Sequence, residues 1–167
     1  MIAVVGCGNT NRRDDGVGPE IVRILRQRAT HEHRSVLPYS GLQLIDAGID
    51  GMAAMFAARG CLSLIVVDAC RSGSPPGSVF ELPGSEVERN NAPALTLHDF
   101  RWEHALYAGR QIFRDHFPTD VIVLLIEAES VAFGIGLSAA VSTAAELVVE
   151  RIVALVESRS PRSQATA

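Results

Sequence analysis

The sequence predicts an α/β fold of three layers, in which helices cover both faces of a five-stranded, mostly parallel sheet with one antiparallel strand. Two observations lead to this prediction. Short apolar runs alternate with longer segments of helical periodicity, and the third apolar run is β-branched on both faces, as in a central parallel strand. A length of 167 residues suits one domain with a substantial core. We expect that domain over residues 1–158 and a disordered tail over residues 159–167.

The first 70 residues contain three predicted strands and two predicted helices. The strands cover residues 2–6, 42–48 and 62–70. The first helix covers residues 17–28, and one of its faces carries the apolar residues Val17, Ile21, Ile24 and Leu25. The second helix covers residues 51–60, and we expect Gly60 to end it from the C′ position.

The remaining chain predicts two further strands and two helices. Residues 78–82 follow the third strand too closely for a helical crossover, so we expect them to run antiparallel, as a hairpin-like neighbour of that strand. A helix over residues 98–113 precedes the last strand, residues 120–128. The closing helix covers residues 136–158, and its buried stripe consists of Leu137, Val141, Val148, Ile152 and Leu155.

Composition argues against several classes of protein. The net charge is −4, every basic side chain is Arg, and these are scattered, which speaks against a nucleic-acid-binding face. No apolar run approaches the roughly 20 residues that span a bilayer, and Met1 leads into a strand without a basic flank, so we expect neither a membrane segment nor an export signal. The three cysteines form no CxxC pair, which favours a reducing cytoplasm.

The segment "GCGNTNRRDDGVG", residues 6–18, joins the first strand to the first helix. A dinucleotide-binding fingerprint would need a third glycine where Asn11 stands, and acids follow where phosphate charge would lie. The glycines therefore predict a tight turn with close packing, and we expect Asn9 to bond the loop backbone. Asp14 is expected to face solvent or to cap the helix. A nucleotide-linked enzyme stays as a weaker alternative.

Carboxylates follow the predicted parallel strands. Asp15 lies in the loop after the first strand, Asp46 and Asp68 end the second and third, and Glu127 ends the last. The carboxyl ends of parallel strands meet at one edge of a sheet, where ligands bind. Unpaired carboxylates there would repel and raise the pKa of one another, so we expect a cation among them. For Asp46, organising its own turn is the favoured interpretation.

His98 is the one histidine expected at this edge. In "TLHD", Thr96 is a predicted N-cap and Asp99 completes a capping-box-like pair, so His98 would lie in the first turn of a helix. The positive end of the helix disfavours imidazolium, and a neutral ring can bind a metal. With Asp15 and Asp68 it would form a site of two carboxylates and one imidazole, which suits Ni²⁺ or Zn²⁺.

Four other side chains near the predicted site have two interpretations each. Cys7 and Cys70 flank the site and could supply a thiol ligand, although burial as small apolar side chains is the simpler prediction. Arg12 and Arg13 are expected to be solvated, or else to contact an acidic segment of a partner.

Six motifs recur in the order and spacing of a known family, from residue 2 to about residue 155. They are "VVGCGNTNRRDDGVG", "DAGIDGM", "LIVVDA", a lone "LH" before a helix, "EAES" and "GIGLS". The sequence resembles the hydrogenase maturation proteases, the endopeptidases that process the large subunit of [NiFe]-hydrogenases. It departs from the common pattern of the family at Ile49, Ala128 and Ala139.

The resemblance implies a fold, a site and a substrate. The fold would be a phosphorylase/hydrolase-like three-layer α/β/α sandwich with one antiparallel strand. The metal-coordinating positions of the family correspond to Asp15, Asp68 and His98. The nickel would arrive in the immature large subunit, with no organic cofactor, and the protease would sense it before removing a short C-terminal peptide.

The same resemblance implies an aspartyl-type endopeptidase in which Asp15, Asp68 and His98 are the catalytic and metal-binding residues. The nickel, or a carboxylate for which Asp46 is the candidate, would polarise the carbonyl or activate water. No Ser-His-Asp or Cys-His arrangement is evident, so we expect no covalent intermediate. The alternative is a non-proteolytic nickel-sensing or chaperone-like binding module for the same subunit.

Overall fold

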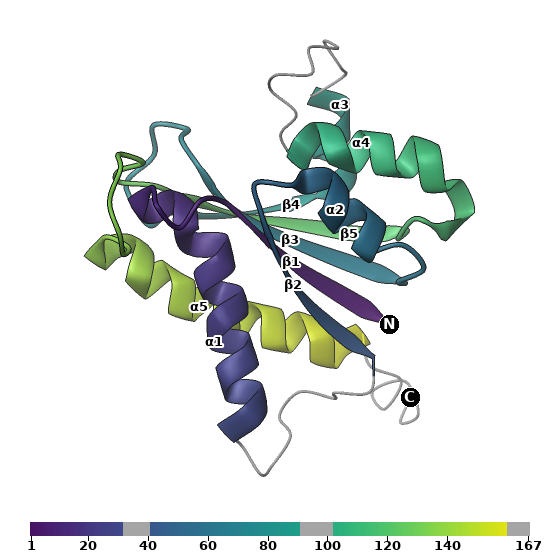
Figure 1. Cartoon of the computed structure of the whole chain (residues 1–167), viewed down its shortest axis with the longest axis horizontal. Helices are drawn as coiled ribbons and strands as arrows, with labels where there is room; N and C mark the ends of the chain where they lie inside the picture. Colours follow the sequence, from purple (N-terminus) through teal and green to yellow (C-terminus); the bar gives the residue numbers. More distant parts are fainter. Residues whose placement is uncertain (32–40, 91–101, 160–167) are drawn as a thin grey trace.

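A five-stranded sheet forms the centre of the protein, with helices on both faces (Figure 1). The computed structural model describes residues 1–31, 41–90 and 102–159. The strands are β1 (Ile2–Cys7), β2 (Leu42–Gly48), β3 (Ser63–Cys70), β4 (Val79–Pro83) and β5 (Asp120–Glu127). The helices are α1 (Val17–His31), α2 (Gly51–Ala57), α3 (Gly84–Asn90), α4 (Trp102–Phe113) and α5 (Ala139–Arg159), with short 3₁₀ turns η1 (Arg13–Gly16) and η2 (Arg114–His116).

The strand order is β2-β1-β3-β5-β4, and only β4 runs antiparallel to its neighbour. The predicted fold class and the predicted direction of β4 are confirmed. The predicted neighbour is wrong, because β4 pairs with β5 and not with β3. β5 pairs with β3 along its whole length, from Ser63 beside Asp120 to Cys70 beside Glu127, and therefore occupies the place that a hairpin would need. The short helix α3 was not predicted from the sequence.

Alternate residues of each central strand pack against different helices. On one face, Val4 and Ile65 lie in a cluster with the apolar residues of α1 and α5. On the other face, Val5 and Val66 lie in a cluster with α2, α3 and α4. The predicted stripes of α1 and α5 are confirmed, since all their members are buried or packed against the first cluster. Within the described residues, no helix has both the length and the apolar character that crossing a membrane requires.

The ends of several helices differ from the prediction. α2 ends at Ala57 and its C-cap is Ala58, so the C′ residue is Arg59 and Gly60, with φ of 79°, lies one position beyond it. The described part of α4 begins at Trp102, and Thr96, His98 and Asp99 lie outside the described residues. α5 continues to Arg159, the first residue of the predicted tail, and residues 160–167 are not described.

α1 contacts the sheet backbone to backbone. A methyl group on Gly18 would lie 2.6 Å from the Val67 carbonyl oxygen and would overlap the carbonyl of Cys7. A methyl group on Gly6 would lie 2.5 Å from the carbonyl carbon of Gly18. The predicted close packing of this glycine motif is therefore confirmed, and it fixes where the loop between β1 and α1 must run.

Asp14 joins this loop to the segment between β5 and α5. Its carboxylate is fully buried and accepts hydrogen bonds from three backbone N–H groups, those of Glu129 (2.9 Å), Ser130 (3.0 Å) and Ser138 (2.6 Å). The expectation that Asp14 faces solvent or caps α1 was therefore wrong. A buried carboxylate is tolerated when several N–H donors surround it, and here the donors come from a segment more than a hundred residues away.

Glu127, at the end of β5, holds the loop that follows β3. Its buried carboxylate accepts hydrogen bonds from the backbone N–H groups of Ser72 (2.9 Å) and Gly73 (2.9 Å) and from the Ser72 hydroxyl (2.7 Å). The bonds from Ser72 and then Gly73 lower the pKa of Glu127 to about 2, against the opposing effect of burial. One of the predicted strand-end carboxylates is thus occupied in holding a loop.

The contact between α1 and β1 can be tested with Gly18→Ala. We expect the free energy of unfolding to fall by about 3 kcal/mol, the upper end of the usual cost of overpacking, because the obstructing atoms are backbone and cannot rotate away. Urea unfolding measures this loss. Gly60→Ala is the matched control, since open space surrounds Gly60 and only its positive φ opposes the methyl group, at a cost of about 1 kcal/mol. Equal losses in the two variants would contradict the proposed packing.

The hydrogen bonds of Glu127 predict that Glu127→Gln lowers the stability of the protein, by an amount that depends on pH. Because the folded-state pKa of Glu127 is depressed, its stabilising contribution is present above the ordinary pKa of 4.5 and is lost as the pH falls toward 2. The variant should therefore have a lower urea midpoint than the wild type at pH 7, and the difference should shrink below pH 4.5. Glu129→Gln, at an exposed position two residues away, should change little. A difference that is independent of pH would disprove this account.

Candidate functional site

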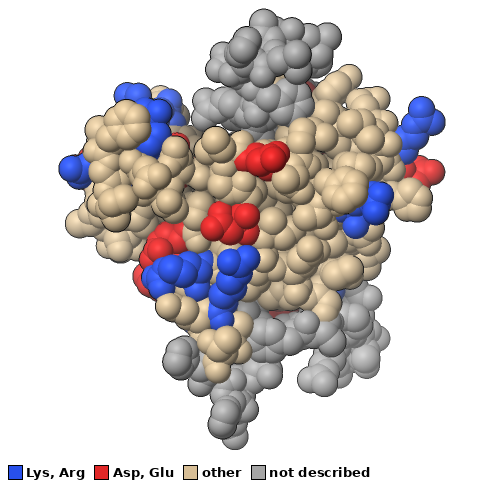
Figure 2. Space-filling view, in the orientation of Figure 1, with Lys and Arg blue, Asp and Glu red and all other residues tan. Residues whose placement is uncertain are grey.

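The loops after β1, β3 and β5 meet at the carboxyl edge of the sheet, at the upper left of Figure 1. Basic side chains gather over these loops on the same face of the molecule (Figure 2). The loops after β1 and β5 also bond each other directly, since Arg13 N donates to Gly134 O (2.9 Å) and Gly134 N donates to Asn11 O (3.0 Å). This edge is therefore a connected set of loops with a fixed backbone.

Asp15 lies in η1, directly before α1, and its side chain is partly exposed. Its Oδ2 accepts a hydrogen bond from the backbone N–H of Asn9 (3.1 Å). Asn9 Oδ1 in turn accepts from the N–H of Asn11 (3.0 Å), which confirms the predicted role of Asn9 in bonding the loop. The loop thus orients Asp15 with its own backbone.

Asp68 lies near the end of β3 and is buried, with its Oδ1 accepting from the N–H of Ala69 (2.8 Å). Gly8 separates it from Asp15. A methyl group on Gly8 would lie 3.5 Å from Asp68 Oδ1 and would overlap the backbone carbonyl of Asp15, and the φ of Gly8 is 127°. A glycine at this position therefore allows the loop of Asp15 to approach the carboxylate of Asp68.

The third predicted ligand, His98, lies outside the described residues, so the complete set of Asp15, Asp68 and His98 stays a prediction. Within the described ranges, no group of three or more His, Cys, Asp or Glu side chains is placed to hold a metal ion. Asp15, through its backbone carbonyl, and Asp68, through its carboxylate, both lie next to Gly8. Two carboxylates and an imidazole are a set that binds divalent ions, so the predicted site would need both side chains to turn toward one point.

Asp46 lies two residues before the end of β2, at the same edge, and is exposed. Its Oδ1 accepts a hydrogen bond from the N–H of Gly48 (3.0 Å), and Gly48 has a φ of 52°. This bond is the turn-organising role that we weighed for Asp46. Its part in hydrolysis stays a prediction.

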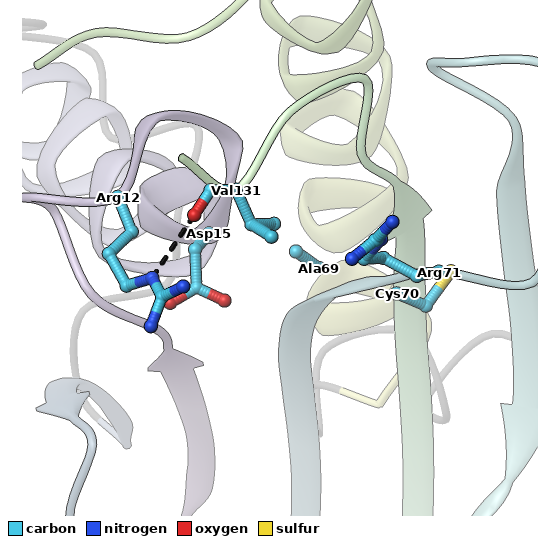
Figure 3. A pocket seen from close by; sticks show the side chains of 6 residues that line it. All are labelled: Arg12, Asp15, Ala69, Cys70, Arg71 and Val131. Atoms are coloured by element: carbon cyan, nitrogen blue, oxygen red, sulfur yellow. Dashed lines mark hydrogen bonds between the residues drawn. The ribbon is translucent and has the colours of Figure 1, made fainter. Parts of the chain in front are cut away.

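An open pocket of about 350 Å³ adjoins Asp15 (Figure 3). It is lined by Arg12, Asp15, Ala69, Cys70, Arg71 and Val131, which come from the end of β3 and from the loops after β1, β3 and β5. We did not predict Arg71 as a site residue. Its position directly after the predicted third strand nevertheless places it at the functional edge.

Cys70 lines the pocket but is a poor candidate for a thiolate ligand. Its Sγ donates a hydrogen bond to Glu127 Oε2 (3.3 Å). Burial, the hydrogen bond to Glu127 and the charge of Glu127 raise the pKa of Cys70 to about 12, so that the thiol keeps its proton at neutral pH. Cys7 is buried in the core, as predicted. All three cysteines lie in the described residues, and none forms a disulfide.

Comparison with known proteins gives consistent matches. Residues 19–155 match the family model of the HycI hydrogenase maturation proteases. The hydrogenase 2 maturation protease of Escherichia coli is 29% identical over 154 residues, which are 92% of this chain and 88% of that protein. The coenzyme F420 hydrogenase subunit delta of Methanothermobacter thermautotrophicus is 29% identical over 92 residues, 54% of this chain, and the match spans only 56% of that subunit.

A solved structure extends the similarity to the fold. The hydrogenase maturating endopeptidase HybD from E. coli superposes with a TM-score of 0.76 at 26% identity, over 94% of this chain and 92% of that one. The residues matched by the family model include Asp46, Asp68 and the described strands β2 to β5. Since these residues make up most of the chain, it belongs to the hydrogenase maturation protease family.

Proposed function

We propose that this protein is an endopeptidase that removes a C-terminal peptide from the nickel-loaded precursor of a [NiFe]-hydrogenase large subunit. The observation that supports this most directly is that the backbone of Asp15 and the carboxylate of Asp68 both adjoin Gly8, with Asp15 lining an open pocket, in a member of this family. The chemistry of two carboxylates suits recognition of a divalent ion that is presented by a folded substrate.

Nickel enters this proposal as part of the substrate. Asp15, Asp68 and His98 would contact the ion already bound in the precursor, and a precursor without nickel would not be held correctly. The residues fit this task, because two carboxylates and a neutral imidazole form a set that binds borderline divalent ions. Their contact with the ion would place one peptide bond of the precursor beside the pocket, which favours hydrolysis through orientation.

Asp46 is our candidate for the group that activates water. It is exposed at the same edge, and its hydrogen bond from Gly48 engages one carboxylate oxygen. A carboxylate held in this way could accept a proton from water through its other oxygen. The three cysteines without a disulfide are consistent with our proposal that the protein acts in a reducing cytoplasm.

The proposal predicts that Asp15→Asn and Asp68→Asn each slow cleavage of the nickel-loaded precursor by at least about 100-fold. Loss even of an indirect partner of a metal ion commonly lowers activity 10- to 100-fold, and these residues would contact the ion themselves. His98→Gln should behave in the same way. Mass spectrometry of the precursor after incubation with each variant measures the shortened product.

Asp115→Asn is the matched control, because Asp115 is exposed in η2, at the opposite end of the sheet. It should cleave at the wild-type rate, and a nickel-free precursor should resist every variant. Full cleavage by Asp15→Asn would refute the assigned site. A wild-type protein that binds the precursor without shortening it would refute the endopeptidase and support the binding module instead.

A further inference from the structure

The pocket beside Asp15 carries two arginines, Arg12 and Arg71, that the proposed cleavage does not use. Figure 3 shows them on different sides of the pocket, with Asp15 beside Arg12. Both side chains are exposed, and the pocket is open to solvent. One carboxylate and two guanidinium groups line the pocket, so the net charge of its lining is +1.

Arg12 is fixed in place by its neighbours. Its Nε donates a hydrogen bond to the carbonyl oxygen of Val131 (3.1 Å), and its guanidinium carbon lies 5.3 Å from the centre of the Phe133 ring. The segment that carries Val131 and Phe133 is itself held by Asp14. The terminal nitrogens of Arg12 form no hydrogen bond or ion pair with any described residue. They therefore form a pre-oriented pair of donors.

Arg71 is held through its backbone. The N–H groups of the next two residues, Ser72 and Gly73, are bound by Glu127, so the backbone beside Arg71 is restrained. Its guanidinium forms no hydrogen bond or ion pair within the described parts of the chain. By contrast, other arginines of this protein are paired with carboxylates, among them Arg23 with Glu20, Arg110 with Glu88, Arg151 with Glu81 and Arg159 with Asp120.

We propose that Arg12 and Arg71 together bind a carboxylate of the polypeptide substrate and so position the segment that is to be cut. This inference rests on the proposed function, because a polypeptide is the substrate that would bring a carboxylate to this pocket. Guanidinium groups bind carboxylates through paired, charge-assisted hydrogen bonds. The carboxylate would belong either to an acidic side chain or to the C-terminus of the precursor, and both present the same chemistry.

Binding can be measured without cleavage. The probe is an N-acetylated pentapeptide of alanine with aspartate at its second and fourth positions and a free C-terminus, titrated into ¹⁵N-labelled protein at low salt, where exposed charges are least screened. We expect the signals of the pocket loops and of the Arg12 Nε–Hε group to shift. Arg71→Gln and Arg12→Gln should each raise the dissociation constant about tenfold, the scale of one charge-assisted hydrogen bond.

Arg13→Gln is the matched control, because Arg13 is the exposed neighbour of Arg12 but does not line this pocket. It should bind the peptide as the wild type does. A dissociation constant that is unchanged in both Arg12→Gln and Arg71→Gln would overturn the proposal. An Arg13→Gln variant weakened as much as the other two would overturn it as well, because the effect would then be one of general charge.

Two further peptides distinguish the sources of the carboxylate. Replacing both aspartates by asparagine should weaken binding if acidic side chains occupy the pocket, and amidating the C-terminus should weaken it if the chain end does. Either result supports the proposal, whereas full binding by a peptide that carries both changes overturns it.

Cleavage of the precursor provides an independent measurement. Arg71→Gln should raise KM about tenfold and leave kcat unchanged, since the pocket would bind the ground state and the transition state alike. A lower kcat at unchanged KM would contradict a binding role. If the protein cleaves no precursor at all while the peptide still binds through both arginines, the proposed function fails and the carboxylate site stands.

Discussion

The carboxyl edge of this protein depends on buried carboxylates that accept hydrogen bonds from backbone N–H groups. Asp14 binds the segment between β5 and α5, and Glu127 binds the loop after β3. Among the described residues, these two carboxylates connect loops that no helix or strand hydrogen bonds hold together. Because an ionised carboxylate accepts several N–H donors at once, a single side chain can fix a whole turn.

The acids at this edge therefore divide into two groups with different tasks. Asp14 and Glu127 are buried and surrounded by donors, and they hold the loops. Asp15 is partly exposed beside the pocket, and with Asp68 it is the pair that we assign to the substrate. Asp14 and Asp15 are neighbours in the chain, yet η1 directs one into the protein and the other toward the pocket. A short 3₁₀ turn thus separates a buried, supporting carboxylate from one that lines the pocket.

Local pattern predicted most of the fold, and it correctly placed Asp15 and Asp68 at the carboxyl edge of the sheet. The strands were found within a residue or two of their ends, because their apolar runs are short and bounded by turn residues. The partner of β4 was not found, since a strand pairs across space and nothing local in residues 78–82 distinguishes β5 from β3. The roles of Asp14 and Glu127 were missed for the same reason, because their donors lie far away in the chain. Residues 91–101 lie outside the described parts of the chain, so the place of His98 stays a prediction.

The glycines of the first loop have a consequence for the evolution of this family. Gly6, Gly8 and Gly18 are required by backbone contacts, whatever reaction the protein performs. Selection for folding alone would preserve them in a descendant that had lost Asp15 and its activity. A pseudoenzyme of this lineage would still carry the glycine spacing, so the state of the acidic positions, rather than the glycine signature, should separate working members from inactive ones.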